Sequence, residues 1–140
     1  MKTVAISGGF DPIHVGHIEL IQRAKALGDR LVVILNNDNW LMLKKGFVFM
    51  PENERKAVLE AVKGVDEVII SFHEKGTQDM SVCKELEKIH PDIFANGGDR
   101  KADNIPEYQL CDKLEIEMAF NLGDKIQSSS DLVKKVREAK

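Results

Sequence analysis

Two histidines three residues apart, His14 and His17, are the side chains of this sequence best suited to chemistry on a phosphate group. They follow a glycine pair, Gly8 and Gly9, whose backbone can turn sharply and expose its N–H groups to an anion. On a helical first turn the two imidazoles share one face, and Gly16 between them leaves space for a bulky ligand. Imidazole donors, glycine amides and a helix N-terminus together suit the charge that develops on an α-phosphate under attack.

Other interpretations of the histidines stay open. His17 is in phase with apolar residues of the segment that follows it, so alone it fits a core histidine. A zinc site would need further ligands, and no nearby cysteine or third histidine has the required spacing. H-x-G-H alone is a weak pattern, whereas H-x-G-H joined to G-G-F-D-P directly after a strand favours a nucleotide site.

The elements that must position this motif alternate between strand and helix. Strands are predicted at Thr3–Ser7, Arg30–Asn36, Glu67–Ser71, Asp92–Ala95 and Ile116–Phe120. Helices are predicted over His17–Leu27, from Pro51, from a cap at Asp79, over Pro106–Leu114 and from Ser128. The helix from Pro51 is expected to turn inward Val58, Ala61, Val62 and Val65, and residues 37–50 are expected to form a loop. This alternation predicts an α/β fold, a Rossmann-like doubly wound five-stranded parallel sheet in a single domain over residues 1–140, with ligands at the carboxyl ends of the strands.

The segment from Gly8 to His17 resembles the motif G-[TS]-F-D-x-x-H-x-G-H of the cytidylyltransferase-like nucleotidyltransferases. That family includes glycerol-3-phosphate cytidylyltransferase, ADP-heptose synthase, archaeal FAD synthetase and phosphopantetheine adenylyltransferase. The resemblance implies that His14 and His17 are catalytic and that Asp11 contacts the acceptor. The nucleotide-binding residues it implies here are Gly8, Gly9, Phe10 and Gly16. Gly9 stands where the family often has Thr or Ser, so a hydroxyl contact is lost.

The segment after the second predicted strand continues the resemblance. It implies an acceptor contact at Asp38 and a catalytic lysine at Lys44, for which a solvated surface lysine is the alternative. Trp40 could cover the acceptor or cap the core. Arg55 lies in a segment that resembles E-R-x-x-x-L and could clamp phosphate bidentately, or it could be an exposed arginine.

Two segments nearer the C-terminus resemble further family motifs. The run N-G-G-D after the fourth strand is similar to the G-G-D element of the heptose-type enzymes and implies a loop that lines the base; a polar turn is the alternative. The run I-Q-S-S-S-D is similar to I-S-[ST]-[ST], which holds the β- and γ-phosphates, although Ser128 could simply cap a helix. The nucleotide contacts predicted here are Asn96, Gly98, Asp99, Gln127, Ser128, Ser129 and Ser130. The glycerol-phosphate enzymes carry an arginine upstream of this motif, where this chain has Gly123-Asp124-Lys125.

Composition limits the classes of function. Apolar residues make up 43% and charged residues 31% of the chain, and the net charge of −3 argues against a general nucleic-acid or anionic-membrane surface. No apolar run approaches the ~20 residues of a membrane span, the N-terminus has no signal-peptide pattern, and we expect a cytoplasmic location. Cys83 and Cys111 lack the spacing of a disulfide scaffold or zinc site, so no protein metal site is predicted. Mg²⁺ is expected to accompany the triphosphate.

The sequence therefore predicts a nucleotidyltransferase that joins a nucleoside monophosphate, from CTP or ATP, to a phosphorylated small molecule and releases pyrophosphate. A sugar or polyol phosphate is the favoured acceptor, and a phosphopantetheine- or FMN-type adenylyltransferase is the alternative. A non-catalytic nucleotide-binding module is a rival of another class. A fragment of a class I aminoacyl-tRNA synthetase is disfavoured because K-M-S-K-S is absent. The resemblance also implies a homo-oligomer.

Overall fold

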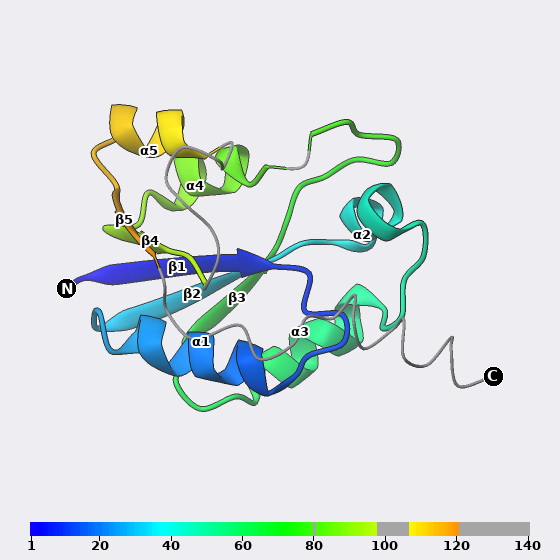
Figure 1. The fold of residues 1–140 in the computed structure, drawn as a ribbon, viewed down its shortest axis with the longest axis horizontal. Helices are drawn as coiled ribbons and strands as arrows, with labels where there is room; N and C mark the ends of the chain where they lie inside the picture. Colours follow the sequence, from blue (N-terminus) through cyan, green and yellow to red (C-terminus); the bar gives the residue numbers. More distant parts are fainter. Residues whose placement is uncertain (80, 98–106, 121–140) are drawn as a thin grey trace.

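The computed structural model describes residues 1–79, 81–97 and 107–120, and within them the centre is a five-stranded sheet (Figure 1). The strands are β1 (Thr3–Gly8), β2 (Arg30–Leu35), β3 (Glu67–Ile70), β4 (Ile93–Ala95) and β5 (Glu117–Ala119). They run in the order β3-β2-β1-β4-β5, and every neighbouring pair is parallel. The predicted fold class is confirmed.

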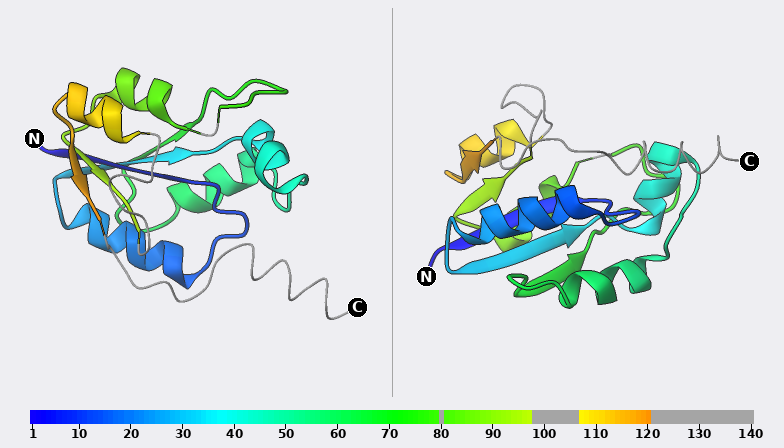
Figure 2. Two further views of the ribbon diagram at one scale, coloured as in Figure 1. Left: turned by 45° about the horizontal axis from the view of Figure 1, so that its top comes forward. Right: turned by 60° about the horizontal axis from the view of Figure 1, so that its bottom comes forward.

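Helices cover both faces of the sheet. They are α1 (Val15–Lys25), α2 (Asp38–Lys45), α3 (Glu52–Glu60), α4 (Cys83–Ile89) and α5 (Tyr108–Lys113). Helices α1 and α3 lie on one face, α4 and α5 lie on the other, and α2 lies beyond the carboxyl ends of the strands (Figures 1 and 2). The faces change because the chain passes from β3 across to β4, on the far side of β1 from β2. The carboxyl ends of β1 and β4 therefore form the switch point at which such folds bind ligands.

Strand alternation divides the core into two apolar clusters. The cluster under α1 and α3 takes from the three central strands Val4, Ile6, Leu31, Val33, Leu35, Ile93 and Ala95. The cluster under α4 and α5 takes from the same strands Ala5, Ile34 and Phe94, and adds Leu86, Cys111 and Ile116. Because side chains along a strand point to opposite faces, a buried parallel strand needs apolar residues at successive positions, as β2 has in Leu31–Leu35.

Three local predictions are wrong. Residues 38–45 form helix α2 instead of a loop, because the Asn37 side chain caps its first turn and Gly46, with φ of 80°, ends it. The inward face predicted for the helix from Pro51 is wrong at Val58 and Ala61, which are exposed, because α3 buries Arg55 and Leu59 instead. Val62 and Val65 pack against the core as predicted. Helix α4 begins after Val82, since Asp79 bonds instead to Ser81. The helix predicted from Ser128 lies outside the described residues.

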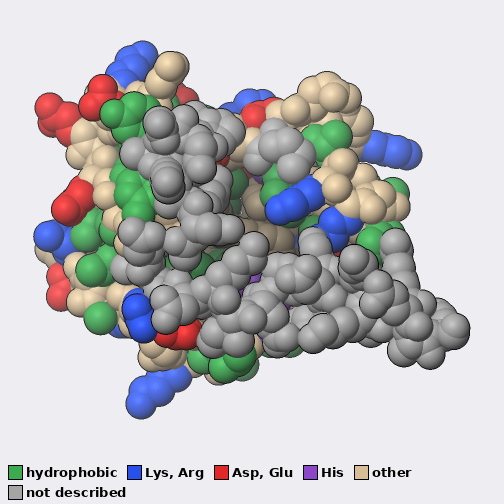
Figure 3. Space-filling view, in the orientation of Figure 1, with side chains coloured by type: hydrophobic (Ala, Val, Ile, Leu, Met, Phe, Trp, Pro, Cys, Tyr) green, Lys and Arg blue, Asp and Glu red, His purple; other side chains and the backbone are tan. Residues whose placement is uncertain are grey.

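The surface is of mixed charge. On the face in Figure 3, acidic and basic side chains are interspersed with apolar ones, as the small net charge of the chain leads one to expect. Among residues 1–79, 81–97 and 107–120, no helix is long and apolar enough to cross a bilayer.

Candidate active site

The two histidines hold each other in place at the start of α1. His14 is the N-cap: its Nδ1 accepts the Gly16 N–H at 3.1 Å, and its own backbone N–H donates to His17 Nδ1 at 3.1 Å. The imidazole rings stack with centroids 3.9 Å apart and an interplanar angle of 27°. The H-x-G-H spacing thus builds a reciprocal cap in which imidazoles replace the Ser/Thr and Glu of the usual capping box.

Those bonds decide where the imidazole protons lie. Each Nδ1 accepts a backbone N–H, so each neutral ring carries its proton on Nε2. Burial lowers the pKa of His17 to about 3, and the charges of His14 and Lys45 act in the same direction. Burial also lowers the pKa of His14. The Nε2 of His14 is buried and has no hydrogen-bond partner among the described residues. The pair is therefore two neutral N–H donors, one of them held ready for an incoming acceptor.

The turn before the histidines is closely packed. Phe10 is buried and meets the His17 ring edge-on at 4.8 Å. A Cβ added at Gly8 would lie 3.1 Å from the Phe10 ring, and one at Gly9 would lie 3.0 Å from Trp40 Cζ3. The family hydroxyl missing at Gly9 therefore has a structural reason, because the Trp40 indole fills the space that a side chain would need.

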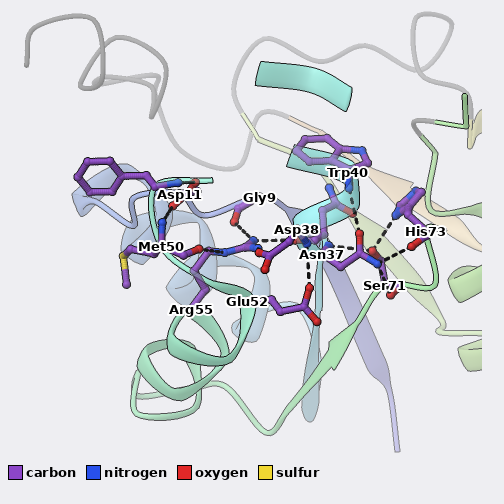
Figure 4. Close-up of polar contacts among 12 residues, drawn as sticks. Gly9, Asp11, Asn37, Asp38, Trp40, Met50, Glu52, Arg55, Ser71 and His73 are labelled. Atoms are coloured by element: carbon purple, nitrogen blue, oxygen red, sulfur yellow. Dashed lines mark hydrogen bonds and ion pairs between the residues drawn. The ribbon is translucent and has the colours of Figure 1, made fainter. Parts of the chain in front are cut away.

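Asp11 fixes the segment that follows α2. Its carboxylate accepts the backbone N–H groups of Phe49 and Met50 at 2.8 and 2.6 Å (Figure 4). The carbonyl of Asp11 accepts a hydrogen bond from Lys45 Nζ at 2.8 Å. Asp11 is buried, and its observed partners all belong to the protein. Its contact with the acceptor stays a prediction. Lys45, which no sequence motif singled out, is the lysine near His17, and burial lowers the pKa of Lys45. Lys44 lies instead over the Trp40 ring, 4.8 Å from its centroid.

Arg55 joins three segments of the rim. Its guanidinium donates to the carbonyls of Met50, Gly9 and Asn36 at 2.8, 2.7 and 2.6 Å, and to Asp38 Oδ1 at 2.6 Å (Figure 4). The side chain is fully buried, so the exposed arginine considered as an alternative is wrong. Four of its five N–H donors are used. These contacts favour a positioning role over a bidentate phosphate clamp.

A second polar cluster ties α2 to the end of β3. The Asn37 amide donates to the carbonyls of Ser71 and His73 at 3.1 and 2.7 Å, and its backbone N–H donates to Ser71 Oγ (Figure 4). His73 Nε2 donates to the Ser81 carbonyl at 2.8 Å, so Nδ1 is the acceptor of the Ser71 hydroxyl proton at 2.7 Å. Every heteroatom of the Ser71–His73 pair is thus engaged, which indicates a structural tie and not a nucleophile with its base.

The remaining predicted residues fall in two groups. Trp40 is buried against Gly9, so of its two predicted roles the structure supports capping the core. Asp38 pairs with Arg55 and keeps a 37% exposed side chain. Asn96 is buried at the end of β4. The predicted nucleotide contacts outside the described residues are Gly98, Asp99, Gln127, Ser128, Ser129 and Ser130.

Comparison with known proteins agrees with this geometry. A model of the family described as Cytidylyltransferase-like matches residues 5–136. The chain belongs to the cytidylyltransferase-like family. The family predicted from the motifs is therefore confirmed, and with it the class of enzyme, a nucleotidyltransferase.

Curated relatives come from two groups within the family. The FAD synthase of Ferroglobus placidus is 42% identical over 103 residues, covering 74% of this chain and 63% of the relative. The FAD synthase of Thermococcus kodakarensis is 39% identical over 116 residues, covering 82% and 70%. The bifunctional protein HldE of Koribacter versatilis is 39% identical over 106 residues, covering 74% of this chain and 21% of HldE. The chain thus spans less than two thirds of the Ferroglobus relative and about a fifth of HldE.

A solved structure supports the fold. The lipopolysaccharide core biosynthesis protein of Thermoplasma volcanium superposes with a TM-score of 0.71 at 27% identity, covering 88% of this chain and 98% of that one. The likeness therefore extends over almost the whole of a protein of similar size.

Proposed function

We propose that this nucleotidyltransferase transfers AMP from ATP to FMN and releases pyrophosphate. The observation that carries the proposal is the pair of neutral, Nε2-protonated imidazoles at the switch point, in a chain 39–42% identical to two FAD synthases. The sequence motifs favour a sugar or polyol phosphate as acceptor, with the FMN-type reaction as the alternative. The relatives support that alternative better.

The chemistry needs no protein nucleophile. An oxygen of the acceptor phosphate, already ionised at neutral pH, attacks the α-phosphorus of ATP; the new P–O bond forms as the bond to pyrophosphate breaks. Positioning and charge stabilisation supply the catalysis. His14 and His17 donate their Nε2–H groups to the non-bridging α-phosphate oxygens, whose charge grows in the transition state. Burial lowers the pKa of both imidazoles and so favours the neutral form of each ring, most strongly at His17.

A lysine supplies positive charge beside the histidines. Lys45 is held by the Asp11 carbonyl and lies close enough to His17 to lower its pKa. An ammonium group so placed can follow phosphate charge through the displacement. We assign this role to Lys45 in the first place, and Lys44, over Trp40, keeps its predicted role as a second candidate.

Magnesium enters as part of the nucleotide. The carboxylate of Asp11 accepts two backbone N–H groups, and that of Asp38 pairs with Arg55. Within the described ranges no group of three or more His, Cys, Asp or Glu side chains could hold a metal. Mg²⁺ characteristically binds through substrate phosphates with few protein ligands, so ATP is proposed to carry it into the site.

A panel of substrates tests the proposal. ATP, CTP, GTP and UTP are each combined with FMN, a heptose phosphate, glycerol 3-phosphate and phosphopantetheine, and pyrophosphate release is measured. The expected result is release with ATP and FMN, with FAD as the second product. Release with another acceptor and none with FMN contradicts the proposed acceptor. Tight ATP binding without release for any acceptor supports the non-catalytic nucleotide-binding module.

A heptose phosphate is the second candidate acceptor, because HldE is as similar to this chain as one of the FAD synthases, at 39% identity. The predicted homo-oligomer and cytoplasmic location stay predictions.

A further inference from the structure

Three polar residues, Ser7, Asn36 and Asn96, lie within one residue of the carboxyl ends of the three central strands, on the same face of the sheet. The residues two positions earlier all belong to the apolar cluster beneath α4 and α5: Ala5, Ile34 and Phe94. Side chains two apart on a strand point the same way, so the polar residues continue the row of each apolar one. The floor under α4 and α5 thus changes from apolar to polar on β2, β1 and β4 together, at their carboxyl ends.

The backbone at these positions still follows the sheet. Asn36 N–H donates to the Gly8 carbonyl at 2.9 Å, and Asn96 N–H donates to the Ala119 carbonyl at 2.7 Å. The alternation of side chains therefore holds one residue beyond β2 and β4. Ala5 is paired with Phe94, which puts Ser7 beside Asn96 two residues further along the same pair of strands.

The two amides are buried with unmet hydrogen-bonding capacity. Asn36 is 4% and Asn96 is 3% exposed. The Oδ1 atom of each is buried and has no hydrogen-bond partner within the part of the chain described here. A buried, unpaired amide oxygen costs free energy and is rare. Two of them on one face of the sheet, at the carboxyl ends of central strands, therefore call for a ligand that bonds to both.

We propose that Ser7, Asn36 and Asn96 form a subsite, here called the amide subsite, for a neutral hydroxyl- or N–H-bearing part of the acceptor. This assigns Asn96, predicted from the sequence as a nucleotide contact, to the acceptor instead, because its side chain continues the row of Phe94 on the α4–α5 face. The proposal rests on the proposed function. Amide oxygens accept hydrogen bonds, so they repel phosphate oxygens and suit a donor-rich group. The subsite lies on the α4–α5 face, whereas the histidines belong to α1 on the opposite face. The acceptor and the triphosphate therefore reach the rim from different faces.

Two acceptor chemistries share this description: the hydroxyl chain and imide N–H of a flavin phosphate, and the hydroxyls of a sugar phosphate. Binding of FMN, of a heptose phosphate and of a non-hydrolysable ATP analogue is measured separately, with Asn36→Leu and Asn96→Leu as variants. Loss of one hydrogen bond of ~1.4 kcal/mol should raise the Kd of the acceptor about tenfold. The Kd of the ATP analogue should stay within about twofold, the scatter of a small context effect. Asn53→Leu, the same change at an exposed asparagine of α3, is the matched control and should move neither.

Modified acceptors sharpen the test. A flavin whose ribityl chain is replaced by a phosphopentyl chain lacks the hydroxyls, and N3-methyl FMN lacks the imide N–H. The wild-type chain should bind one of them about tenfold more weakly than FMN, and an Asn→Leu variant should lose that preference. The analogue that behaves so identifies the group in the subsite. Equal preference in wild type and variants overturns the proposal, and so does a variant that weakens the ATP analogue instead.

Ser7→Ala keeps the test open should an Asn→Leu chain fail to fold, because Ser7 is only half-buried. Ser7→Ala should raise the Kd of the acceptor several-fold and leave the unfolding midpoint unchanged. All these measurements are of binding, so they separate two failures. Selective acceptor binding without pyrophosphate release contradicts the proposed function and leaves the subsite standing. Pyrophosphate release with acceptor affinities that the three substitutions do not change overturns the subsite alone.

Discussion

At the carboxyl ends of the strands, the two faces of the sheet differ in how far their polar groups are hydrogen-bonded within the protein. On the α1 face, both imidazole Nδ1 atoms, the Asp11 carboxylate and four N–H groups of Arg55 are bonded within the protein, and the buried Nε2 of His14 has no partner among the described residues. On the α4–α5 face, Asn36 and Asn96 are more fully buried than the two histidines, and their amide oxygens have no partner among the described residues. Groups that act on the reacting phosphate gain from being held before the substrate arrives. Groups that select an acceptor must leave bonds for it to make.

The largest effect is expected from removal of the prepared donor. His14→Ala should lower kcat by about 10²–10³-fold, the usual cost of one lost oxyanion donor. It also removes the Nδ1 cap of α1, which should cost about 1 kcal/mol of unfolding free energy and leave the chain folded. Pyrophosphate release by a chain with an unchanged circular dichroism spectrum is the measurement. His14→Gln, which can still donate an N–H, should recover part of the loss. A folded His14→Ala chain with wild-type turnover would remove His14 from the mechanism.

The second-largest effect is expected from weakening the hydrogen bonds of Arg55 on the α1 face. Arg55→Lys keeps the charge but cannot reach three carbonyls and a carboxylate at once. Displacement of the histidine loop by about 1 Å would lower kcat by about 10²-fold with the Kd of ATP little changed. If Arg55 clamped a phosphate instead, Arg55→Lys would raise the Kd of ATP and leave kcat little changed. Glu54→Gln, on the exposed face of the same helix, serves as the control.

The buried histidine should also make stability depend on pH. Folded His17 stays neutral down to a pKa of about 3, whereas the unfolded chain takes up a proton near the ordinary value of 6.5. The unfolded state therefore binds more protons between these values, and the free energy of unfolding should fall as pH drops from 6.5 toward 3. Urea unfolding at pH 7.5 and 5 measures the loss. His17→Gln should have a smaller loss, and an identical one would show that His17 does not cause it.

The smallest effect concerns the contact behind the histidine loop. A methyl group at Gly9 would lie 3.0 Å from Trp40 and 3.1 Å from Leu41, so Gly9→Ala should cost about 1 kcal/mol of unfolding free energy through overpacking. In a Trp40→Phe background the same substitution should cost less. A double-mutant cycle by chemical denaturation tests the coupling, and additive costs would mean that the indole does not limit this position.

Much of this arrangement was predictable from sequence patterns. Short apolar runs predict strands β1 and β2. The glycine pair after the first run predicts the turn into the helix that starts at H-x-G-H. Helix α2 could have been predicted, since Asn37 and Gly46 are an ordinary cap and stop. The amide subsite also had a signal, a polar residue two positions after an apolar one at the end of each central strand.

Other features needed coordinates. Arg55 follows the pattern of an exposed helix residue, and its burial depends on carbonyls from segments up to 46 residues away. The choice between Lys44 and Lys45 depends on the phase of a helix that begins seven residues earlier. The sugar-phosphate preference rested on short loop motifs, while identity over most of the chain supports the FMN-type alternative.

The span between α2 and α3 has consequences for which lengths of chain this fold tolerates. Its last residues are held from both sides, because the Asp11 carboxylate accepts the Phe49 and Met50 N–H groups while Arg55 donates to the Met50 carbonyl. One inserted or deleted residue here would put the wrong peptide group against both partners. Variation in length should instead accumulate after β3, where residues 74 and 75 are exposed, and a library of single-residue insertions would show one permissive turn and one forbidden one.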